Sequence, residues 1–281
     1  MSENPTIVEV RNLDVRGVEP YRTLRRQAGH FREGIFVAEG EKVVRRLLGS
    51  GIPVRSMLLT PEWFGTLFPG GEGAAARGAF VSGSKIFLAR KDLLESIVGF
   101  NLHQGIMAVA ETPAEITPDE LIRDAAGGAR LYVALDDLVN AENVGLVVRN
   151  CAAFGVDALI CGETSSSPYL RRAVRASMGT VFGLPIHHSA DLASTLSALA
   201  SRAGIGTIAA DPAGDSSLFS TELTGSVCIV MGHEGTGIRP AVLAACERRV
   251  AIPMWKGTDS LNVSSACAVF LSEARRQRDT G

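Results

Sequence analysis

The second half of the chain alternates short apolar runs with segments of helical periodicity, and this alternation restricts the possible folds more than any other feature. The apolar runs cover 131–135, 158–161, 207–210, 227–231 and 250–252, and the helical segments cover 142–154, 190–203 and 264–276. Strands and helices in alternation predict a mostly parallel sheet with helices on both faces. We therefore expect an α/β domain over residues 129–281.

The first half predicts a second, smaller α/β domain. Residues 21–51 have a helical pattern interrupted by a strand-like run at 36–38, and further strands are expected at 54–59 and 86–89. At 281 residues the chain exceeds the usual size of a single core, so two domains are natural. We expect a flexible arm at 1–20, the small domain at 21–110, and a linker with two prolines and a Gly-Gly pair at 111–128.

Charge and cysteine content restrict the environment and the partners. The net charge is only −2, so a nucleic-acid partner would require a local basic patch. The five cysteines are odd in number and form no C-x-x-C pair, which predicts buried, reduced thiols. The first residues have no signal-peptide pattern and no apolar run reaches the ~20 residues of a membrane helix, so we expect a cytoplasmic protein.

The segment Asn143–Asn150 carries the first candidate site. On a helix over 142–154, Arg149 lies directly above Gly145, four residues earlier, and the glycine leaves space beside the guanidinium. A planar fork of donors next to a cleft suits a phosphate group. The alternative is that Arg149 pairs with Asp136 or Asp137 at a strand end.

The second candidate site is the glycine-rich turn Gly232–Gly237, which follows the run at 227–231. Its glycines allow close backbone approach to a ligand, but their spacing and position do not fit a Rossmann dinucleotide site. Glu234 is either a site residue or a cap of a helix over 238–246. We interpret His233 as a strand-end histidine without a chemical role. The adjacent His187 and His188 would point to opposite faces of a strand, so no metal site is predicted.

The third candidate site is the segment 252–265. Ser260 and Asn262 precede the last helix, and Ser264 or Ser265 is the favoured cap of that helix. The apolar wall suits an adenine held by main-chain hydrogen bonds, and it comprises Ile252, Met254, Leu261 and Val263.

Together and in this order, the three segments resemble the SpoU (TrmH-type) branch of the SPOUT RNA methyltransferases. The resemblance implies a trefoil knot within roughly 225–281, S-adenosylmethionine as cofactor, and methyl transfer to a ribose 2'-hydroxyl of rRNA or tRNA. It also implies a homodimer formed through the C-terminal domain. The N-terminal block is similar to the L30e-like domain of many such enzymes, which would bind RNA.

The resemblance also implies roles for individual residues. Catalytic or substrate-orienting roles fall on Asn143, Arg149, Glu234, Ser260 and Asn262. Cofactor binding falls on Met231, Gly232, Gly237, Ile252, Met254, Leu261 and Val263. RNA contacts are expected at Arg22, Arg25 and Arg26, and on a short helix at Tyr169, Arg171, Arg172 and Arg175, which would otherwise be a solvated face.

Two other functions fit the same sequence. One is a non-catalytic RNA-binding or ribosome-assembly factor that kept the fold, although such a protein would need only a basic surface and not the polar residues of the three segments. The other is a SPOUT enzyme that methylates a base, for which we would expect a C-terminal motif different from Ser260-Leu261-Asn262.

Overall fold

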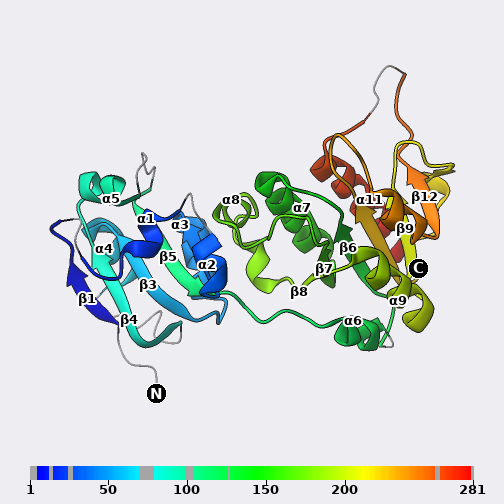
Figure 1. Cartoon of the computed structure of the whole chain (residues 1–281). Coiled ribbons are helices and arrows are strands. Elements are labelled where there is room, and N and C mark those ends of the chain that lie inside the picture. Colours follow the sequence, from blue (N-terminus) through cyan, green and yellow to red (C-terminus); the bar gives the residue numbers. More distant parts are fainter. Residues whose placement is uncertain are drawn as a thin grey trace. The chain divides into compact units, whose positions relative to one another are not determined.

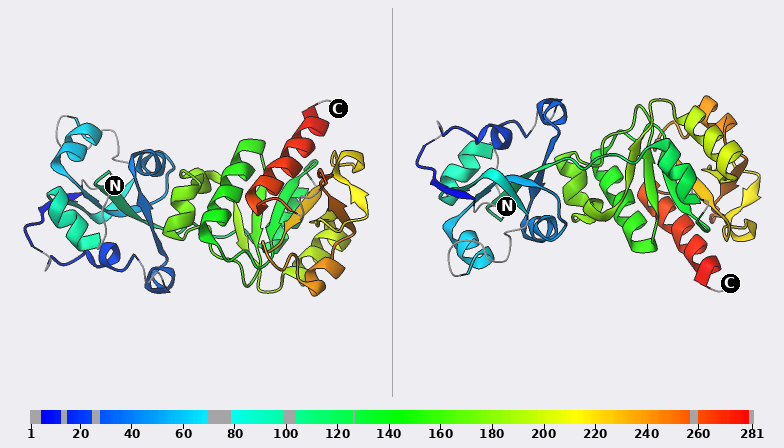
Figure 2. Two further views of the ribbon diagram at one scale, coloured as in Figure 1. Left: turned by 90° about the horizontal axis from the view of Figure 1, so that it is seen from above. Right: turned by 90° about the horizontal axis from the view of Figure 1, so that it is seen from below.

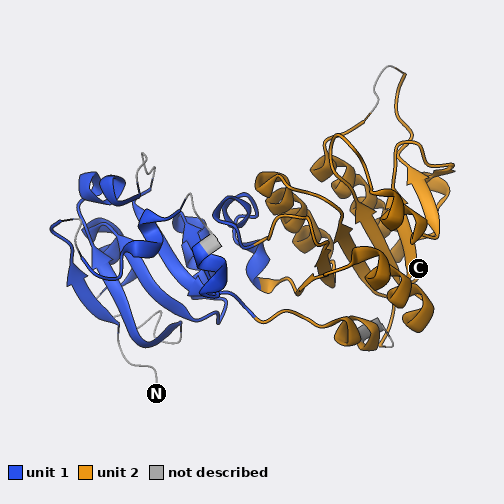
Figure 3. Cartoon of the chain, in the orientation of Figure 1, with its two compact units in different colours: residues 1–113, 169–182 blue, residues 114–168, 183–281 orange. Residues whose placement is uncertain are grey.

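The computed structural model describes residues 5–12, 15–24, 28–69, 79–98, 104–125, 127–256 and 260–279. The chain forms two compact units, coloured separately in Figure 3. Unit 1 consists of residues 1–113 and 169–182, and unit 2 consists of residues 114–168 and 183–281. Residues 169–182 therefore belong with the N-terminal unit although both flanking segments belong to unit 2.

Unit 1 contains a mixed five-stranded sheet in the order β1-β4-β3-β5-β2 (Figure 1). The strands are β1 (Thr6–Glu9), β2 (Ile35–Glu39), β3 (Val54–Leu59), β4 (Phe80–Leu88) and β5 (Ile106–Glu111). The helices are α1 (Glu19–Arg22), α2 (Ala28–Arg32), α3 (Glu41–Leu48), α4 (Pro61–Leu67), α5 (Lys91–Val98) and α8 (Arg171–Ala176). β4 runs parallel to β1 and β3, whereas β5 is antiparallel to β2 and β3. A buried Tyr21 hydroxyl is hydrogen-bonded to Ser56 Oγ at 2.9 Å inside this unit.

The structure differs from the expected N-terminal arm and from the expected linker. Residues 6–9, expected in a flexible arm, form β1, because they make a parallel ladder with β4 and because Val10 and Val18 are buried in the core of unit 1. The expected linker contains α6 (Pro118–Ala125), whose Leu121 is buried in the core of unit 2. Thr117 and Glu120 form a reciprocal capping box at the start of α6, with Thr117 N–Glu120 Oε2 at 2.8 Å and Glu120 N–Thr117 Oγ1 at 3.3 Å.

Unit 2 confirms the predicted α/β class with a parallel sheet. Its seven strands lie in the order β10-β12-β9-β11-β6-β7-β8, and every neighbouring pair is parallel. The strands are β6 (Leu131–Leu135), β7 (Ala158–Cys161), β8 (Ile186–His188), β9 (Gly206–Ala210), β10 (Ser216–Ser217), β11 (Val227–Met231) and β12 (Arg248–Ala251). The two central strands, β11 and β6, are buried along their whole length, as their uninterrupted apolar sequences require.

Helices cover both faces of this sheet, as Figure 2 shows. α9 (Leu192–Ala203) packs against both α6 and α10 (Pro240–Ala244), and α7 (Ala141–Phe154) packs against α11 (Val263–Asp279). Short 3-10 turns follow α8 at Thr180–Gly183 and β10 at Leu218–Ser220.

In the described part of the chain, no helix is long and apolar enough to cross a membrane. Four of the five cysteines are buried, as predicted, whereas Cys246 is partly exposed.

α7 has clear start and stop signals. The Asn140 side chain accepts hydrogen bonds from the backbone N–H groups of Glu142 and Asn143, at 2.9 and 3.3 Å. Gly155 ends the helix in the left-handed conformation, with φ of +71°, which a residue without a Cβ adopts at little cost. These signals fix where α7 begins and ends, and they place Asn143 in its first turn.

Candidate active site

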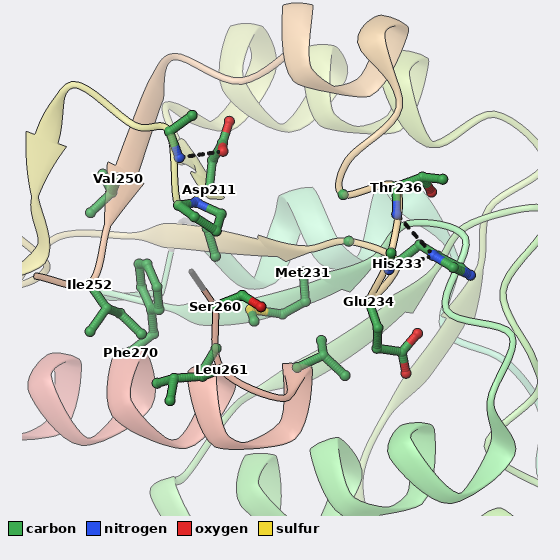
Figure 4. A pocket seen from close by; sticks show the side chains of 18 of the residues that line it. Asp211, Met231, His233, Glu234, Thr236, Val250, Ile252, Ser260, Leu261 and Phe270 are labelled. Carbon is green, nitrogen blue, oxygen red and sulfur yellow. Dashed lines mark hydrogen bonds between the residues drawn. The ribbon is translucent and has the colours of Figure 1, made fainter. Parts of the chain in front are cut away.

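A cavity of about 370 Å³ opens at the carboxyl ends of β9, β11 and β12 (Figure 4). Ala210 ends β9, Met231 ends β11, and Val250 and Ile252 come from the end of β12, while Val263, Ala266 and Phe270 of α11 close another side. Ligands of parallel α/β sheets bind at the carboxyl ends of the strands, and ligand pockets have volumes of ~300–1,000 Å³. The position and size of the cavity are therefore those of a small-molecule site.

The glycine-rich loop after β11 forms one wall of this cavity. His233 and Gly237 are joined by two backbone hydrogen bonds, of 3.0 and 2.9 Å, which close the loop at its base. A Cβ on Gly232 would lie 2.5 Å from the carbonyl carbon of Gly237, so only glycine fits there. The absence of a side chain at Gly232 therefore lets the two ends of the loop approach each other closely beside the cavity.

Three polar side chains from three distant segments meet beside the cavity. The Asn143 amide nitrogen donates a hydrogen bond to the Glu234 carboxylate, and the Asn262 amide nitrogen donates to Asn143 Oδ1 at 3.3 Å. In Figure 4 the Glu234 side chain extends away from the loop, and its partner Asn143 lies on α7. Glu234 is hence a member of this cluster. The alternative that it caps the next helix is wrong, because Asp136 Oδ2 accepts the Arg239 N–H at the start of α10, at 2.6 Å.

Asn262 also caps the last helix. Its Oδ1 accepts hydrogen bonds from Ser264 N at 2.9 Å and Ser264 Oγ at 2.6 Å, and its carbonyl accepts from Ala266 N at 2.9 Å. The expectation that Ser264 or Ser265 is the cap was wrong, because α11 begins at Val263 and both serines lie inside it. Asn150 of α7 donates to the Ser264 carbonyl at 2.7 Å, which ties α7 to the first turn of α11.

Arg149 stands apart from this cluster. It is exposed on α7, and no described residue forms a hydrogen bond or ion pair with it. The alternative pairing with Asp136 is wrong, because that fully buried carboxylate binds Arg239, with Nε–Oδ1 at 2.7 Å. Arg149 is thus available to a ligand.

Arg239 also pairs with Glu163, at 2.7 Å from Nη1 to Oε1. This hydrogen bond lowers the pKa of Glu163 and helps to raise the pKa of Arg239.

The structure brings the residues expected to bind the cofactor together. All seven line the cavity, and so do Glu234 and Ser260. Apolar residues from the end of β12 and from α11 line the cavity together with the glycine-rich loop, which fits a ligand with a planar heteroaromatic ring and polar substituents. Sequence reasoning missed Asp211, Pro212 and Ala213, which also line the cavity. These three residues directly follow the strand predicted at 207–210, and this position could have identified them as part of the site.

The basic residues expected to contact RNA are in different situations, all within unit 1. Tyr169 is buried, with its ring 5.2 Å from that of Phe36, and Arg171 forms an ion pair with the buried Glu39 carboxylate. Arg175 approaches the same carboxylate at 3.8 Å but remains half exposed, and Arg172 is exposed. Tyr169 and Arg171 therefore hold α8 onto β2. Arg22 is exposed, whereas Arg25 and Arg26 lie outside the described residues.

These features define the class: an α/β enzyme domain with a cofactor cavity at the carboxyl edge of a parallel sheet. The sequence model of the SpoU rRNA Methylase family matches residues 130–272, which is half of the chain, and the protein belongs to this family. An uncharacterized tRNA/rRNA methyltransferase from Mycobacterium bovis is 30% identical over 248 residues, covering 87% of this chain and 82% of that protein.

Two solved structures extend the comparison. The SpoU methyltransferase AviRb from Streptomyces viridochromogenes, in complex with the cofactor AdoMet, is 25% identical with a TM-score of 0.79, covering 95% of this chain and 100% of that chain. An AdoMet-bound rRNA methyltransferase from Sinorhizobium meliloti has the same fold, with 23% identity, a TM-score of 0.81, and coverage of 96% and 98%. The chain is accordingly an RNA methyltransferase that uses S-adenosylmethionine.

Proposed function

We propose that this protein transfers a methyl group to a ribose 2'-hydroxyl of rRNA or tRNA. The observation that carries the proposal is the Glu234–Asn143–Asn262 cluster beside the cavity, with Ser260 on the cavity wall and an available Arg149 on α7. This set of side chains accompanies the sequence motifs that resemble those of 2'-O-methylating SpoU enzymes. The M. bovis relative is described as acting on tRNA or rRNA, in agreement with either substrate.

The cavity residues have a direct interpretation in this proposal. Ile252, Met254 and Leu261 would flank the adenine, and the main chain of the loop from Gly232 to Gly237 would supply hydrogen bonds to its edge and to polar substituents. When bound, S-adenosylmethionine supplies a methyl group that is electrophilic because it is attached to a positively charged sulfur. The protein has to hold the hydroxyl oxygen in line with that group, and most of the rate gain comes from such positioning.

The polar cluster would provide this positioning. Both amide side chains have a defined orientation. Asn262 Oδ1 caps α11, so the Asn262 amide nitrogen points to Asn143 Oδ1. The Asn143 amide nitrogen then points to the Glu234 carboxylate. Arg149 would grip a phosphate next to the target ribose with its fork of donors. It would not act as the base, because a guanidinium stays protonated and has no free lone pair.

RNA binding would extend beyond the cavity. We assign the exposed Arg22, Arg172 and Arg175 of unit 1 to phosphate contacts, and we assign unit 1 as an L30e-like RNA-docking domain. We also propose a trefoil knot within roughly 225–281 and a homodimer formed through the C-terminal domain. A protein that only binds RNA would have no use for the cofactor cavity or for the oriented amides beside it.

The test is methyl incorporation from labelled S-adenosylmethionine into total RNA from a strain lacking the gene, followed by nucleoside mass spectrometry. We expect a 2'-O-methylated nucleoside that is absent from the deletion strain and is restored by the purified protein. An Asn143→Ala protein is the matched control, and it should restore the nucleoside about tenfold to hundredfold more slowly. A methylated base in place of a methylated ribose would overturn the proposed acceptor, and cofactor binding without incorporation into any RNA fraction would favour a non-catalytic role.

A further inference from the structure

His233 bends back over the loop that it begins. Its Nδ1 atom lies 2.9 Å from the backbone nitrogen of Gly235 and 3.2 Å from that of Thr236. Both backbone groups are N–H donors, so Nδ1 must be the acceptor and must carry no proton. The neutral ring then carries its proton on Nε2, and neither nitrogen has a lone pair free to remove a proton from a substrate. Figure 4 shows the ring turned away from Met231 and Ser260.

The loop has few other constraints. Glu234, Gly235 and Thr236 are all exposed, so no burial of their side chains fixes the backbone. Glycine at 235 and at 237 increases the conformational freedom that has to be lost on ordering. At the base, the two hydrogen bonds between His233 and Gly237 hold the ends of the loop together but leave its tip unbonded. In the tip itself, the two N–H groups bound by Nδ1 are those of the two residues that follow Glu234.

We infer that His233 is a positioning residue, which fixes the tip of the loop so that Glu234 meets Asn143 and the main chain of the loop faces the cofactor. The inference rests on the assignment of the cavity to S-adenosylmethionine. It requires an acceptor at the δ position of residue 233 and nothing else from the imidazole. An asparagine would meet this requirement, because its Oδ1 occupies the same position and commonly accepts the N–H two residues later. A phenylalanine keeps the ring and removes the acceptor.

The experiment compares the full-length wild-type protein with the His233→Asn and His233→Phe variants, by calorimetric titration with S-adenosylmethionine and by methyl transfer to RNA. We expect His233→Phe to raise the cofactor Kd about tenfold or more, since two net hydrogen bonds are lost, and to lower kcat in addition because Glu234 is no longer held. His233→Asn should stay within about threefold of wild type in both quantities. Equal losses in the two variants, or a His233→Phe protein that binds and turns over normally, would overturn the inference.

A second measurement needs no variant and no ligand. The ¹⁵N spectrum of the histidine rings of the wild-type protein at neutral pH should show His233 with an unprotonated Nδ1 and a protonated Nε2. The opposite tautomer would overturn the inference even if His233→Phe failed to fold. If the wild-type protein showed this tautomer but did not bind S-adenosylmethionine, the assignment of the cavity would fail, and with it the role of His233 toward the cofactor.

Discussion

Asn143 and Glu234 are 91 residues apart in the sequence, yet the amide of one donates a hydrogen bond to the carboxylate of the other beside the cofactor cavity. This bond joins the first turn of α7 to the loop after β11. We expect Asn143→Ala to lower kcat about tenfold to hundredfold while the Kd for S-adenosylmethionine changes little, because the side chain does not line the cavity. Asn143→Asp should be worse, since it places a second carboxylate against Glu234. Kinetics and calorimetry on the same preparations check this, and an Asp variant more active than the Ala variant would contradict it.

Arg149 offers a test of phosphate recognition. Because its guanidinium has no described partner, Arg149→Ala should not alter stability or cofactor binding, whereas methyl transfer should fall about a hundredfold or more. Arg149→Lys keeps the charge but loses the bidentate geometry. Compared with Arg149→Ala, it should therefore recover only part of the activity, mainly through a lower KM for RNA. Loss of cofactor affinity with an unchanged rate would contradict the assignment.

Asn262 has two functions that one substitution separates. Asn262→Asp retains an acceptor for Ser264 N but loses the donor to Asn143 Oδ1, so it should keep the stability of the protein and reduce turnover. Asn262→Ala loses both functions and should also lower the free energy of unfolding by about 1 kcal/mol. Urea unfolding monitored by circular dichroism, together with single-turnover rates, distinguishes the two variants. Equal stabilities for Asp and Ala would show that the cap contributes nothing.

The buried pair of Asp136 and Arg239 should be important for stability. Arg239→Ala leaves the fully buried Asp136 carboxylate without its partner, and we expect a loss of about 3 kcal/mol in the free energy of unfolding. The figure is at the low end for buried pairs because a third of the Arg239 side chain is exposed. Adding Asp136→Asn to this variant should recover part of the loss, because it removes the unpaired charge. Additive losses in the double variant would refute the coupling.

His187 predicts a pH dependence of stability. The ring is buried and its Nδ1 donates to the Ile116 carbonyl at 2.9 Å, and burial lowers the pKa of this histidine in the folded protein. The unfolded chain therefore binds more protons below about pH 6.5, so the stabilising contribution is complete above that pH and is lost as the pH falls. The slope from this one group is at most ~1.4 kcal/mol per pH unit.

The matched control for this effect is His187→Asn, whose amide can still donate to Ile116. Urea unfolding at pH 7.5 and 5.5 should show a smaller decrease for this variant than for the wild-type protein. The remaining decrease would come from other groups such as His30, whose pKa burial also lowers. Identical decreases in the two proteins would exclude His187 as a source.

The elements that could be predicted are those with strong local signals. Leu131–Leu135, Ala158–Cys161 and Val227–Met231 have the bounds expected from their sequences, because each is an apolar run between turn residues. α6 was missed although its Thr117-x-x-Glu120 capping box was visible, since the prolines of that stretch favoured a linker. β1 was missed because a four-residue strand becomes recognisable only beside its partner β4.

The candidate site was predictable to the extent that it consists of contiguous motifs. The seven residues expected around the cofactor come from two such segments, and they meet because β11 and the end of β12 open on the same edge of the sheet. Long-range pairs were not predictable. The ion pairs Asp136–Arg239 and Arg171–Glu39 each join residues more than a hundred positions apart. From the sequence alone, many other arginines would have been equally plausible partners for these carboxylates. Tyr169 was expected to contact RNA, but its ring packs against that of Phe36, a neighbour that only the fold reveals.

The order of the strands in unit 2 has a consequence for how the protein acquires its structure. β6 is the first strand of this sheet along the chain. One of its two neighbours in the sheet, β11, is synthesised only after β7, β8, β9 and β10. Pairings so distant in sequence require closure of a long loop before they gain any energy, which makes folding slow. Until β11 arrives, one edge of β6 has no native partner and can pair with another chain. We therefore expect slow refolding and a strong concentration dependence of its yield, with aggregation arising from this edge.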